Sequence, residues 1–380
     1  MTAGRTGAPA AGAPAAGFFW HERCFWHDPG AIGVFSAPGA FLQPQPASES
    51  PESKRRLKNL LEVSGLIDEL EVRKPPPASR RDLERFHTVR YLDALEAGDR
   101  ARGGDGGDCA PYTPGSLAAA RHSAGLAIAA LEAVATGELA NAYALCRPPG
   151  HHAEADRGRG FCLLGNIPVA VMRARALGQV GRVAILDWDV HHGNGQQAAF
   201  YDDPEVFTVS LHQAGNYPLD TGAFGEQGEG AGEGTNLNLP LPPGCGIGAY
   251  DYAMTELVLP AIEAFAPELI VVACGYDACA KDPLGKMLLN SGAFAAMTRQ
   301  VKALAERICH GRLVLVHEGG YSEGYAPLCG HAAIQVLAES RIEVPDPQND
   351  EIAAWAYQDL QPHQRLLIDG WRDGYTRTRA

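Results

Sequence analysis

The sequence of 380 residues has no Cys-x-x-Cys pair, although it contains nine cysteines. Structural zinc sites are usually closed, four-coordinate and rich in cysteine, so the missing pair argues against a zinc finger. An odd number of cysteines without such spacing is typical of reduced thiols. We therefore expect a cytoplasmic protein in which most cysteines pack as small apolar side chains.

Two further features are scarce. No segment reaches the roughly 20 consecutive apolar residues of a membrane span, so we expect no membrane insertion. Lysine and arginine number 32 against 45 acidic residues, and the net charge of −13 argues against nucleic acid as a direct partner. The acidity suits a cationic substrate such as a lysine-rich peptide or a polyamine, although general solubility explains it more simply.

The chain divides into a short tail and one large region. Residues 1–17 repeat Gly, Pro and Ala without a continuous apolar core, which predicts a disordered tail rather than a signal peptide. Residues 18–380 predict a single catalytic domain. The chain is 46% hydrophobic, which is enough for a large core.

Strand-like and helical segments alternate along this domain, which predicts an α/β fold with an open, mostly parallel sheet flanked by helices. Short apolar runs predict the buried strands AYALC, RVAIL, LIVVAC and LVLVHE. Helices are predicted over 114–136 and at about 54–70, 80–97, 250–265 and 291–309. The final forty residues place Trp355, Tyr357 and Trp371 among charges, which favours an appended helix and a subunit contact, so a homo-oligomer is a hypothesis.

The segment DWDVHHGNG, residues 187–195, follows the strand RVAIL and is the most informative part of the sequence. In an extended chain alternate side chains share a face, so Asp187, Asp189 and His191 would project the same way at the strand end. Glycines at 193 and 195 allow a sharp turn there. Open α/β sheets place their sites at the carboxyl ends of strands, so we expect a metal site at this turn.

A second carboxylate follows the strand LIVVAC in an equivalent place, at Asp277. Together with Asp189 and His191 it makes three oxygen or nitrogen ligands. Three such ligands with an open position are typical of catalytic zinc.

Two other strand ends carry groups suited to proton transfer and hydrogen bonding. The run RPPGHHAEA presents His151 and His152 on a rigid turn after AYALC, and Tyr321 follows paired glycines after LVLVHE. Taken singly, a tandem histidine is usually a surface feature, and a tyrosine at a turn is as often only packed. Their shared position after strands favours a common site.

Six blocks, PPGHHA, GFC (160–162), DWDVHHGNG, VSLH (209–212), GYDA and EGGY, occur in this order between about 146 and 321. In this order they resemble the histone deacetylase family, closest in pattern to class II enzymes and to bacterial histone deacetylase-like amidohydrolases. The resemblance implies an arginase/deacetylase-like fold and zinc bound by Asp189, His191 and Asp277. Zinc lowers the pKa of bound water towards roughly 7 and polarises a carbonyl, as amide hydrolysis requires.

The resemblance also implies roles for the remaining groups. His151 and His152 would form the catalytic pair, oriented by Asp187 and Asn194 respectively, and Tyr321 would donate to the oxyanion. Many class I members have Asp where this chain has Asn194, which favours the class II side. With an unperturbed pKa near 6.5, His152 is the expected base and later acid, while His151 is the more cationic partner; the reverse order stays open.

Potassium is a second cofactor that the resemblance implies. One ion would bind backbone carbonyls and two side chains: the carbonyls of Asp189, His191 and Leu211, and the side chains of Asp187 and Ser210. Another would bind the backbone carbonyls of Phe200, Asp203, Val206 and Thr235. Oxygen-rich clusters of this kind suit hard cations.

The substrate-binding residues that the resemblance implies are Gly160, Phe161, Tyr217 and Leu284. In the family two aromatic side chains flank a narrow tunnel for the acyl-lysine stem, and Phe161 and Tyr217 match them, with tyrosine in place of the usual phenylalanine. Leu284 stands where a polyamine-selective relative has an acidic residue. Leucine offers no partner for a second amine, so an acylated lysine or amine of the acyl-lysine type is the expected substrate.

Three other functions are alternatives to an acyl-lysine hydrolase. An acetylpolyamine amidohydrolase stays open, because bacterial enzymes of that kind vary at the rim. A binuclear manganese ureohydrolase needs another aspartate two residues after the ligand aspartate, where Cys279 stands here, and a thiolate poorly suits manganese. A non-catalytic acyl-lysine binding module would not need His151, His152 and Tyr321 together.

Overall fold

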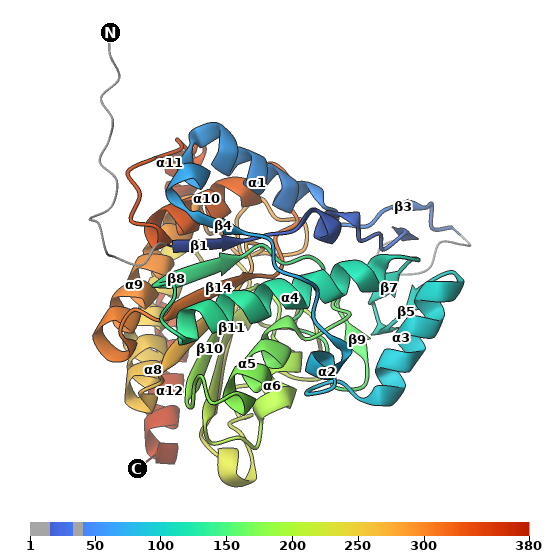
Figure 1. The fold of residues 1–380 in the computed structure, drawn as a ribbon. Helices are drawn as coiled ribbons and strands as arrows, with labels where there is room; N and C mark the ends of the chain where they lie inside the picture. Colours follow the sequence, from blue (N-terminus) through green and yellow to red (C-terminus); the bar gives the residue numbers. More distant parts are fainter. Residues whose placement is uncertain (1–15, 33–40, 380) are drawn as a thin grey trace.

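The computed structural model describes residues 16–32 and 41–379. At the centre of the protein lies one sheet of eight strands, which confirms the predicted α/β class. The sheet was expected to be mostly parallel, and all of its strand pairs are parallel. Figure 1 shows the sheet between two layers of helices. Its strand order is β12 (Asn236–Leu241), β11 (Val206–Gln213), β10 (Val183–Asp187), β13 (Leu269–Cys274), β14 (Leu313–His317), β8 (Asn141–Ala144), β1 (Ala16–Phe19) and β4 (Glu71–Arg73).

The strands are buried on both faces because their sequences are apolar at consecutive positions. In β10, Val183 and Ile185 join one core, whereas Ala184 and Leu186 join the core on the opposite face. The helices that cover the first of these faces are α2 (Arg80–Leu83), α3 (Val89–Ala101), α4 (Ser116–Ala135), α5 (Asn166–Ala176) and α6 (Asn194–Phe200). The opposite face packs against α1 (Glu52–Ser64), α7 (Ile247–Ala253), α8 (Leu259–Phe265), α9 (Ser291–Cys309), α10 (Ala326–Leu337) and α12 (Pro362–Arg379).

Shorter elements complete the chain. The small strand pairs are β2 (Ala31–Ile32) with β3 (Gln45–Pro46), β5 (Gly104–Asp105) with β7 (Pro111–Tyr112), and β6 (Gly107–Asp108) with β9 (Gly158–Arg159). The single-turn helices are η1 (Glu22–Trp26), η2 (Leu66–Glu69), η3 (Gly230–Gly232), the π-helical turn η4 (Met254–Val258) and α11 (Asn349–Ala353). The last helix, α12, agrees with the appended helix expected near the carboxyl terminus.

Three predicted helices are interrupted. The helix expected at about 54–70 ends at Ser64, because Gly65 takes the left-handed conformation with a φ of 82°, and the short turn η2 follows. The helix expected over 80–97 splits into α2 and α3, because the Thr88 side chain accepts from the Tyr91 N–H and caps a new helix. The helix expected over 250–265 contains the turn η4 ahead of Pro260, which lacks the N–H that a regular α-helical bond needs. The helices at 114–136 and 291–309 lie as expected.

The helix α4 corrects the expectation that no segment is apolar enough to span a membrane. Its 20 residues are long and apolar enough to cross a membrane, yet 72% of its most apolar stretch is buried inside the protein. It packs against α5 and the sheet as a core helix.

The amino-terminal boundary also differs from the expected one. Strand β1 begins at Ala16 and pairs with β4 and β8, so the last two residues of the predicted tail belong to the sheet. Residues 1–15, which make up the rest of the predicted tail, lie outside the described residues.

Candidate active site

The carboxyl ends of β10, β13, β14 and β8, four neighbouring strands, carry the predicted site residues. Parallel strands bring their carboxyl ends to one edge of the sheet, so loops that lie far apart in the sequence meet there. Strand β10 ends at Asp187, and the ligand candidates that follow it lie in a bend rather than in extended chain. Strict alternation therefore does not govern them, and Asp187 bonds to His151 and stays outside the group that Asp189 and His191 form.

Asp189, His191 and Asp277 form a buried group whose candidate ligand atoms all lie within 4.8 Å of one another. The Nδ1 atom of His191 lies 3.0 Å from Oδ1 of Asp189 and 3.1 Å from Oδ2 of Asp277. Glycine is required at 275 and 319, because a Cβ atom there would collide with these carboxylates. The sequence thus brings the three predicted ligands together and leaves space for them.

Backbone N–H groups hold both carboxylates in place. Asp189 accepts from Gly319 at 2.8 Å and from His191 at 3.0 Å, and Asp277 accepts from Val190 at 2.8 Å. Since Gly319 follows β14, one hydrogen bond links the β10 and β14 loops through a candidate ligand. The donors follow β10 and β14 and the carboxylates follow β10 and β13, so three strand ends of one sheet pre-organise the group.

The electrostatics of the group favour a bound cation. Burial and the neighbouring Asp189 carboxylate raise the pKa of Asp277 to about 8. Burial opposes charge on His191, but the carboxylates of Asp189 and Asp277 outweigh it and raise its pKa to about 10. The group offers two buried carboxylates and one imidazole, a donor set that fits catalytic zinc. Its histidine, His191, also lines an open pocket.

The tandem histidines lie beside this group with their rings 3.8 Å apart between centroids. His151 Nδ1 is 3.0 Å from Asp187 Oδ2, and His152 Nδ1 is 2.8 Å from Asn194 Oδ1. Both pairings are the ones expected from the sequence. Asp187 also lies close to the amide of Gln196, whose Nε2 donates to it at 2.6 Å.

The two histidines differ in protonation. Burial opposes charge on His151, but Asp189 and Asp187 outweigh it and raise its pKa to about 10. Burial, together with the positive His151 and His191 rings, lowers the pKa of His152 well below its usual value. These shifts favour a cationic His151 and a neutral His152, and the roles of the two histidines stay a prediction.

Several supporting residues were not found from the sequence. The buried Glu318 carboxylate accepts from the N–H groups of Gly150 at 2.6 Å and His151 at 3.1 Å, which fixes the tandem-histidine loop. Asp282 accepts from the N–H of Tyr321 at 2.7 Å and from that of Leu284 at 2.8 Å, which ties two loops of the pocket together. Glu318 opens the EGGY block but was given no role there, and Asp282 lies outside the six blocks, so the three-dimensional contacts reveal what both carboxylates do.

A buried ion cluster lies behind the tandem-histidine loop. The guanidinium of Arg147, which is 0% exposed, donates to Glu49 Oε1 at 2.9 Å and to the backbone carbonyls of Cys24 at 3.1 Å and His27 at 2.9 Å. Lys54 is also buried, and its ammonium lies 5.9 Å from the centre of the Tyr321 ring. The cluster thereby fastens the amino-terminal segment to the loop that presents the histidines.

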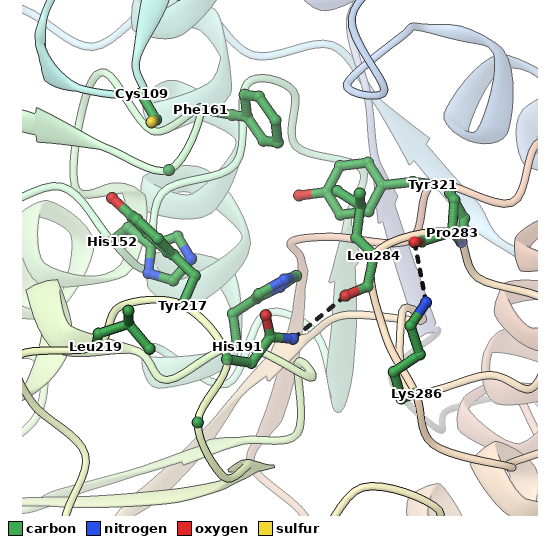
Figure 2. Close-up of a pocket in the computed structure, with 13 residues that line it drawn as sticks. Cys109, His152, Phe161, His191, Tyr217, Leu219, Pro283, Leu284, Lys286 and Tyr321 are labelled. Carbon is green, nitrogen blue, oxygen red and sulfur yellow. Dashed lines mark hydrogen bonds between the residues drawn. The ribbon is translucent and has the colours of Figure 1, made fainter. Parts of the chain in front are cut away.

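An open pocket of about 460 Å³ leads to these groups, and Figure 2 shows the side chains that line it. The four predicted substrate residues Gly160, Phe161, Tyr217 and Leu284 all line it, together with His152, His191 and Tyr321. The pocket is also lined by residues that were not predicted: Cys109, Gly215, Asn216, Leu219, Pro283 and Lys286.

Aromatic rings shape the narrow part of this pocket. The Phe161 ring meets the Tyr321 ring edge-on at 5.8 Å between centroids, and Tyr217 meets His152 edge-on at 5.0 Å. The Tyr217 hydroxyl donates to Asp108 Oδ2 at 3.0 Å, a bond that phenylalanine would not form. The rim tyrosine is therefore fixed by a carboxylate of a neighbouring loop.

The groups expected at the two potassium sites lie in two places. Asp187 and Ser210 are paired across β10 and β11, with Leu211 next along the strand. Phe200, Asp203 and Val206 share a turn, where the Asp203 N–H bonds the Phe200 carbonyl at 3.1 Å and the Thr235 hydroxyl bonds the Asp203 carbonyl at 3.3 Å. Both places are rich in oxygen, and potassium binding there stays a prediction.

Within residues 16–32 and 41–379, two groups of metal-ligating side chains are close enough to share an ion: Asp189, His191 and Asp277, and separately His151, Cys162 and Glu318. Neither supplies the additional carboxylates of a binuclear manganese centre. Cys279 is buried and lies outside both groups. The geometry therefore disfavours the ureohydrolase alternative.

Comparisons with known proteins agree with this arrangement. Residues 47–337 match the family model described as "Histone deacetylase domain". The chain is 52% identical over 356 residues, 92% of its length and 93% of the relative's, to the histone deacetylase-like amidohydrolase of Pseudomonas aeruginosa. It is 37% identical over 357 residues to histone deacetylase 8 of Arabidopsis thaliana, covering 88% of this chain and 90% of that one.

A solved structure supports the fold independently. The crystal structure of the HDA15 HD domain superposes with a TM-score of 0.80 at 28% identity, covering 96% of this chain and 97% of that chain.

Proposed function

The chain belongs to the histone deacetylase family, and from this premise we propose that it is a zinc-dependent hydrolase of acyl-lysine-type amides. Membership makes it an enzyme of the deacetylase and amidohydrolase class with a candidate metal site of the kind these enzymes use. The finer proposal is that it removes acetyl or other short acyl groups. One observation carries it: a single pocket of about 460 Å³ is lined by His152, His191 and Tyr321 together with the aromatic side chains of Phe161 and Tyr217.

Asp189, His191 and Asp277 would hold the zinc ion. When bound, zinc supplies Lewis-acid activation of the amide carbonyl and of the attacking water. The groups around it belong to the chain and divide the remaining work among them.

His152 is suited to move the proton. Its Nδ1 is engaged by Asn194 at 2.8 Å, and its low pKa keeps it neutral and able to accept a proton from water. It would then return that proton to the leaving amine. His151, held cationic by Asp187, would stabilise the negative charge that develops in the site.

Tyr321 would donate its phenolic hydrogen to the tetrahedral oxyanion. Burial raises the pKa of Tyr321 well above its usual value, so its hydroxyl keeps its hydrogen and can donate it. Asp282 holds the Tyr321 backbone at 2.7 Å, which limits the movement of the loop that carries the phenol. The donation is strongest in the transition state and therefore acts on rate.

The rim favours acyl-lysine over a polyamine. Leu284 is apolar, and Lys286, also at the pocket, is a cation that would repel the distal ammonium of an acetylated polyamine. Aromatic faces at Phe161 and Tyr217 suit a slim aliphatic stem between them. Acetylpolyamine hydrolysis and acyl-lysine binding without turnover are the alternatives that the experiment below separates.

Three further expectations complete the proposal. Potassium would bind at the two oxygen-rich places near β10 and β11, and an anomalous signal at a potassium-sensitive wavelength tests this. A cytoplasmic location, tested by cell fractionation, and a homo-oligomer, tested by light scattering, follow only from the sequence arguments.

The deciding experiment assays zinc-loaded enzyme, with its metal content defined, against acyl-lysine peptides of several chain lengths and acetylated polyamines. We expect turnover to be fastest on an acyl-lysine peptide. Faster hydrolysis of polyamines would replace the proposed substrate class. Binding of acyl-lysine peptides without any turnover would establish the binding-module alternative instead.

A further inference from the structure

The side-chain amide of Asn194 has three hydrogen-bond partners, all of them buried or partly buried. Its Oδ1 is 2.8 Å from His152 Nδ1, while its Nδ2 donates to the His152 backbone carbonyl at 3.1 Å and to Glu154 Oε1 at 2.8 Å. We propose that Glu154 is a positioning residue, which acts through Asn194 to fix the tautomer of His152. The inference rests on the role of His152 in the proposed function.

The chemistry of the partners determines which way the amide faces. A backbone carbonyl and a carboxylate can only accept hydrogen bonds, so the two N–H groups of Asn194 must point at them. The amide oxygen then faces His152, and His152 Nδ1 must carry the hydrogen. The lone pair is left on Nε2, the nitrogen that does not contact Asn194.

A reversed amide would have the opposite effect. Its oxygen would face the His152 carbonyl and the Glu154 carboxylate, two acceptors, and its N–H would face Nδ1. His152 would then carry its hydrogen on Nε2 and would have no lone pair there to act as a base. Without Glu154, only the single carbonyl contact at 3.1 Å would disfavour this arrangement.

Glu154 is itself held in place as an anion. Arg157 Nε donates to its Oε2 at 2.8 Å, and Arg159 Nη1 donates to its Oε1 at 3.0 Å. Burial alone would raise the pKa of Glu154, but these hydrogen bonds outweigh it and hold the pKa below its ordinary value. The carboxylate therefore stays an acceptor.

Arg159 extends the link to the rim of the pocket. Its guanidinium, which is 6% exposed, also pairs with Asp220 at 2.9 Å and lies 5.7 Å from the centre of the Tyr217 ring. Arg159 therefore contacts both Glu154, which lies beside Asn194, and Tyr217, which lines the pocket. Among these linked side chains, Glu154 is the one that bonds to Asn194.

The test compares three variants of the zinc-loaded enzyme. Glu154→Ala removes the acceptor, and we expect kcat to fall about tenfold with KM changed less than twofold, on the scale of one charge-assisted hydrogen bond. Glu154→Gln keeps an amide oxygen that can accept from Asn194, so it should recover kcat to within about threefold of the wild type. Arg157→Ala is the matched control, because it removes a partner of Glu154 Oε2 but leaves the Oε1 contact with Asn194.

A spectroscopic measurement tests the tautomer of His152 independently of turnover. Histidine-selective ¹⁵N NMR, with His152 assigned by its loss in His152→Gln, should show hydrogen on Nδ1 in the wild type, in Glu154→Gln and in Arg157→Ala. In Glu154→Ala the signal should shift towards the Nε2–H tautomer. If the Ala variant does not fold, Glu154→Asp, whose side chain is one methylene shorter, replaces it with the same expectation.

Three results would overturn the proposal: a wild-type tautomer in Glu154→Ala, an Nε2–H tautomer in the wild type, or a Gln variant as impaired as the Ala variant. Absence of amide hydrolysis in the wild type would refute the proposed function instead. The tautomer measurement would still decide the positioning role in that case.

Discussion

The pKa values of the adjacent residues His151 and His152 shift in opposite directions: burial opposes charge on both rings, but Asp189 and Asp187 outweigh it at His151, whereas the positive His151 and His191 rings add to it at His152. Asp187 faces the first ring and Asn194 faces the second, and a carboxylate stabilises positive charge whereas a neutral amide does not. Titratable groups whose pKa values are driven apart are typical of acid and base partners in a catalytic site.

Replacement of Tyr321 by phenylalanine should affect rate rather than affinity. We expect Tyr321→Phe to lower kcat by roughly 100-fold or more with little change in substrate affinity, because one oxyanion donor is lost. Steady-state kinetics on the best acyl-lysine peptide measure both, and zinc content serves as the control, since Tyr321 is not among the candidate ligands. An unchanged kcat would remove Tyr321 from the mechanism.

Replacement of Leu284 by glutamate should change substrate preference. A carboxylate at the pocket would gain a charge-assisted bond with the distal ammonium of a polyamine, so we expect Leu284→Glu to shift the ratio of kcat/KM values about tenfold towards acetylated polyamines. Leu284→Gln, of similar size and uncharged, is the control. Equal ratios in the two variants would show that the charge at this position does not select the substrate.

The sequence predicts the metal ligands and the catalytic residues but not the roles of the residues that support them, even where these lie in the same segments, as Glu154 does in RPPGHHAEA and Glu318 in EGGY. The positions of Asp189, His191 and Asp277 follow from strand ends, and their proximity in the structure agrees. Glu318 and Glu154 act on the backbone and on another side chain respectively, and neither contact is encoded in local spacing. Such contacts depend on how separate loops meet, which one sequence does not specify.

At the scale of elements, long apolar runs were predictable and short or interrupted elements were not. β10, β13 and β14 are continuous apolar segments, whereas β1 and β4 are four and three residues long and are stabilised mainly by pairing with each other and with β8. Tertiary packing overrides weak local preference in such strands. Strand β1 and the edge strand β4 were missed for this reason.

The residue that precedes helix α5 donates a hydrogen bond to a histidine that must stay neutral. His87 Nε2 accepts from the N–H of Gly165, the residue before α5, at 2.9 Å, and burial lowers the pKa of His87 to about 4. A histidine pKa lowered on folding means that the unfolded chain binds the proton more tightly. His87 therefore contributes stability that is present above pH 6.5 and is lost as the pH falls towards 4.

We expect this loss to reach at most about 3 kcal/mol, from a shift of this size at 1.36 kcal/mol per pKa unit. In His87→Gln an amide oxygen can accept from Gly165 but does not titrate. The free energies of unfolding of the two proteins in urea should therefore converge as the pH falls from 6.5 to 4. A constant difference between them across that range would mean that His87 does not titrate as described.

At the scale of the whole molecule, the candidate metal group couples ion binding to stability. Its ligands follow β10 and β13, its backbone donors follow β10 and β14, and all of these segments belong to one sheet. A ligand that binds only the folded state stabilises it by about 4 kcal/mol when present at a thousandfold excess over its dissociation constant. Removal of the metal should therefore weaken the central sheet and not only the pocket.

The last prediction is that chelation lowers the Tm of the wild type by several degrees and that added Zn²⁺ restores it. Asp277→Ala removes one candidate ligand, so its Tm should respond to neither treatment, and it should lack both bound zinc and hydrolytic activity. Asp220→Asn is the matched control, because this carboxylate is 59% exposed at the rim and lies outside the metal group. Thermal unfolding with metal analysis measures all three proteins, and an Asp277→Ala variant that kept full zinc occupancy and wild-type turnover would refute the ligand assignment.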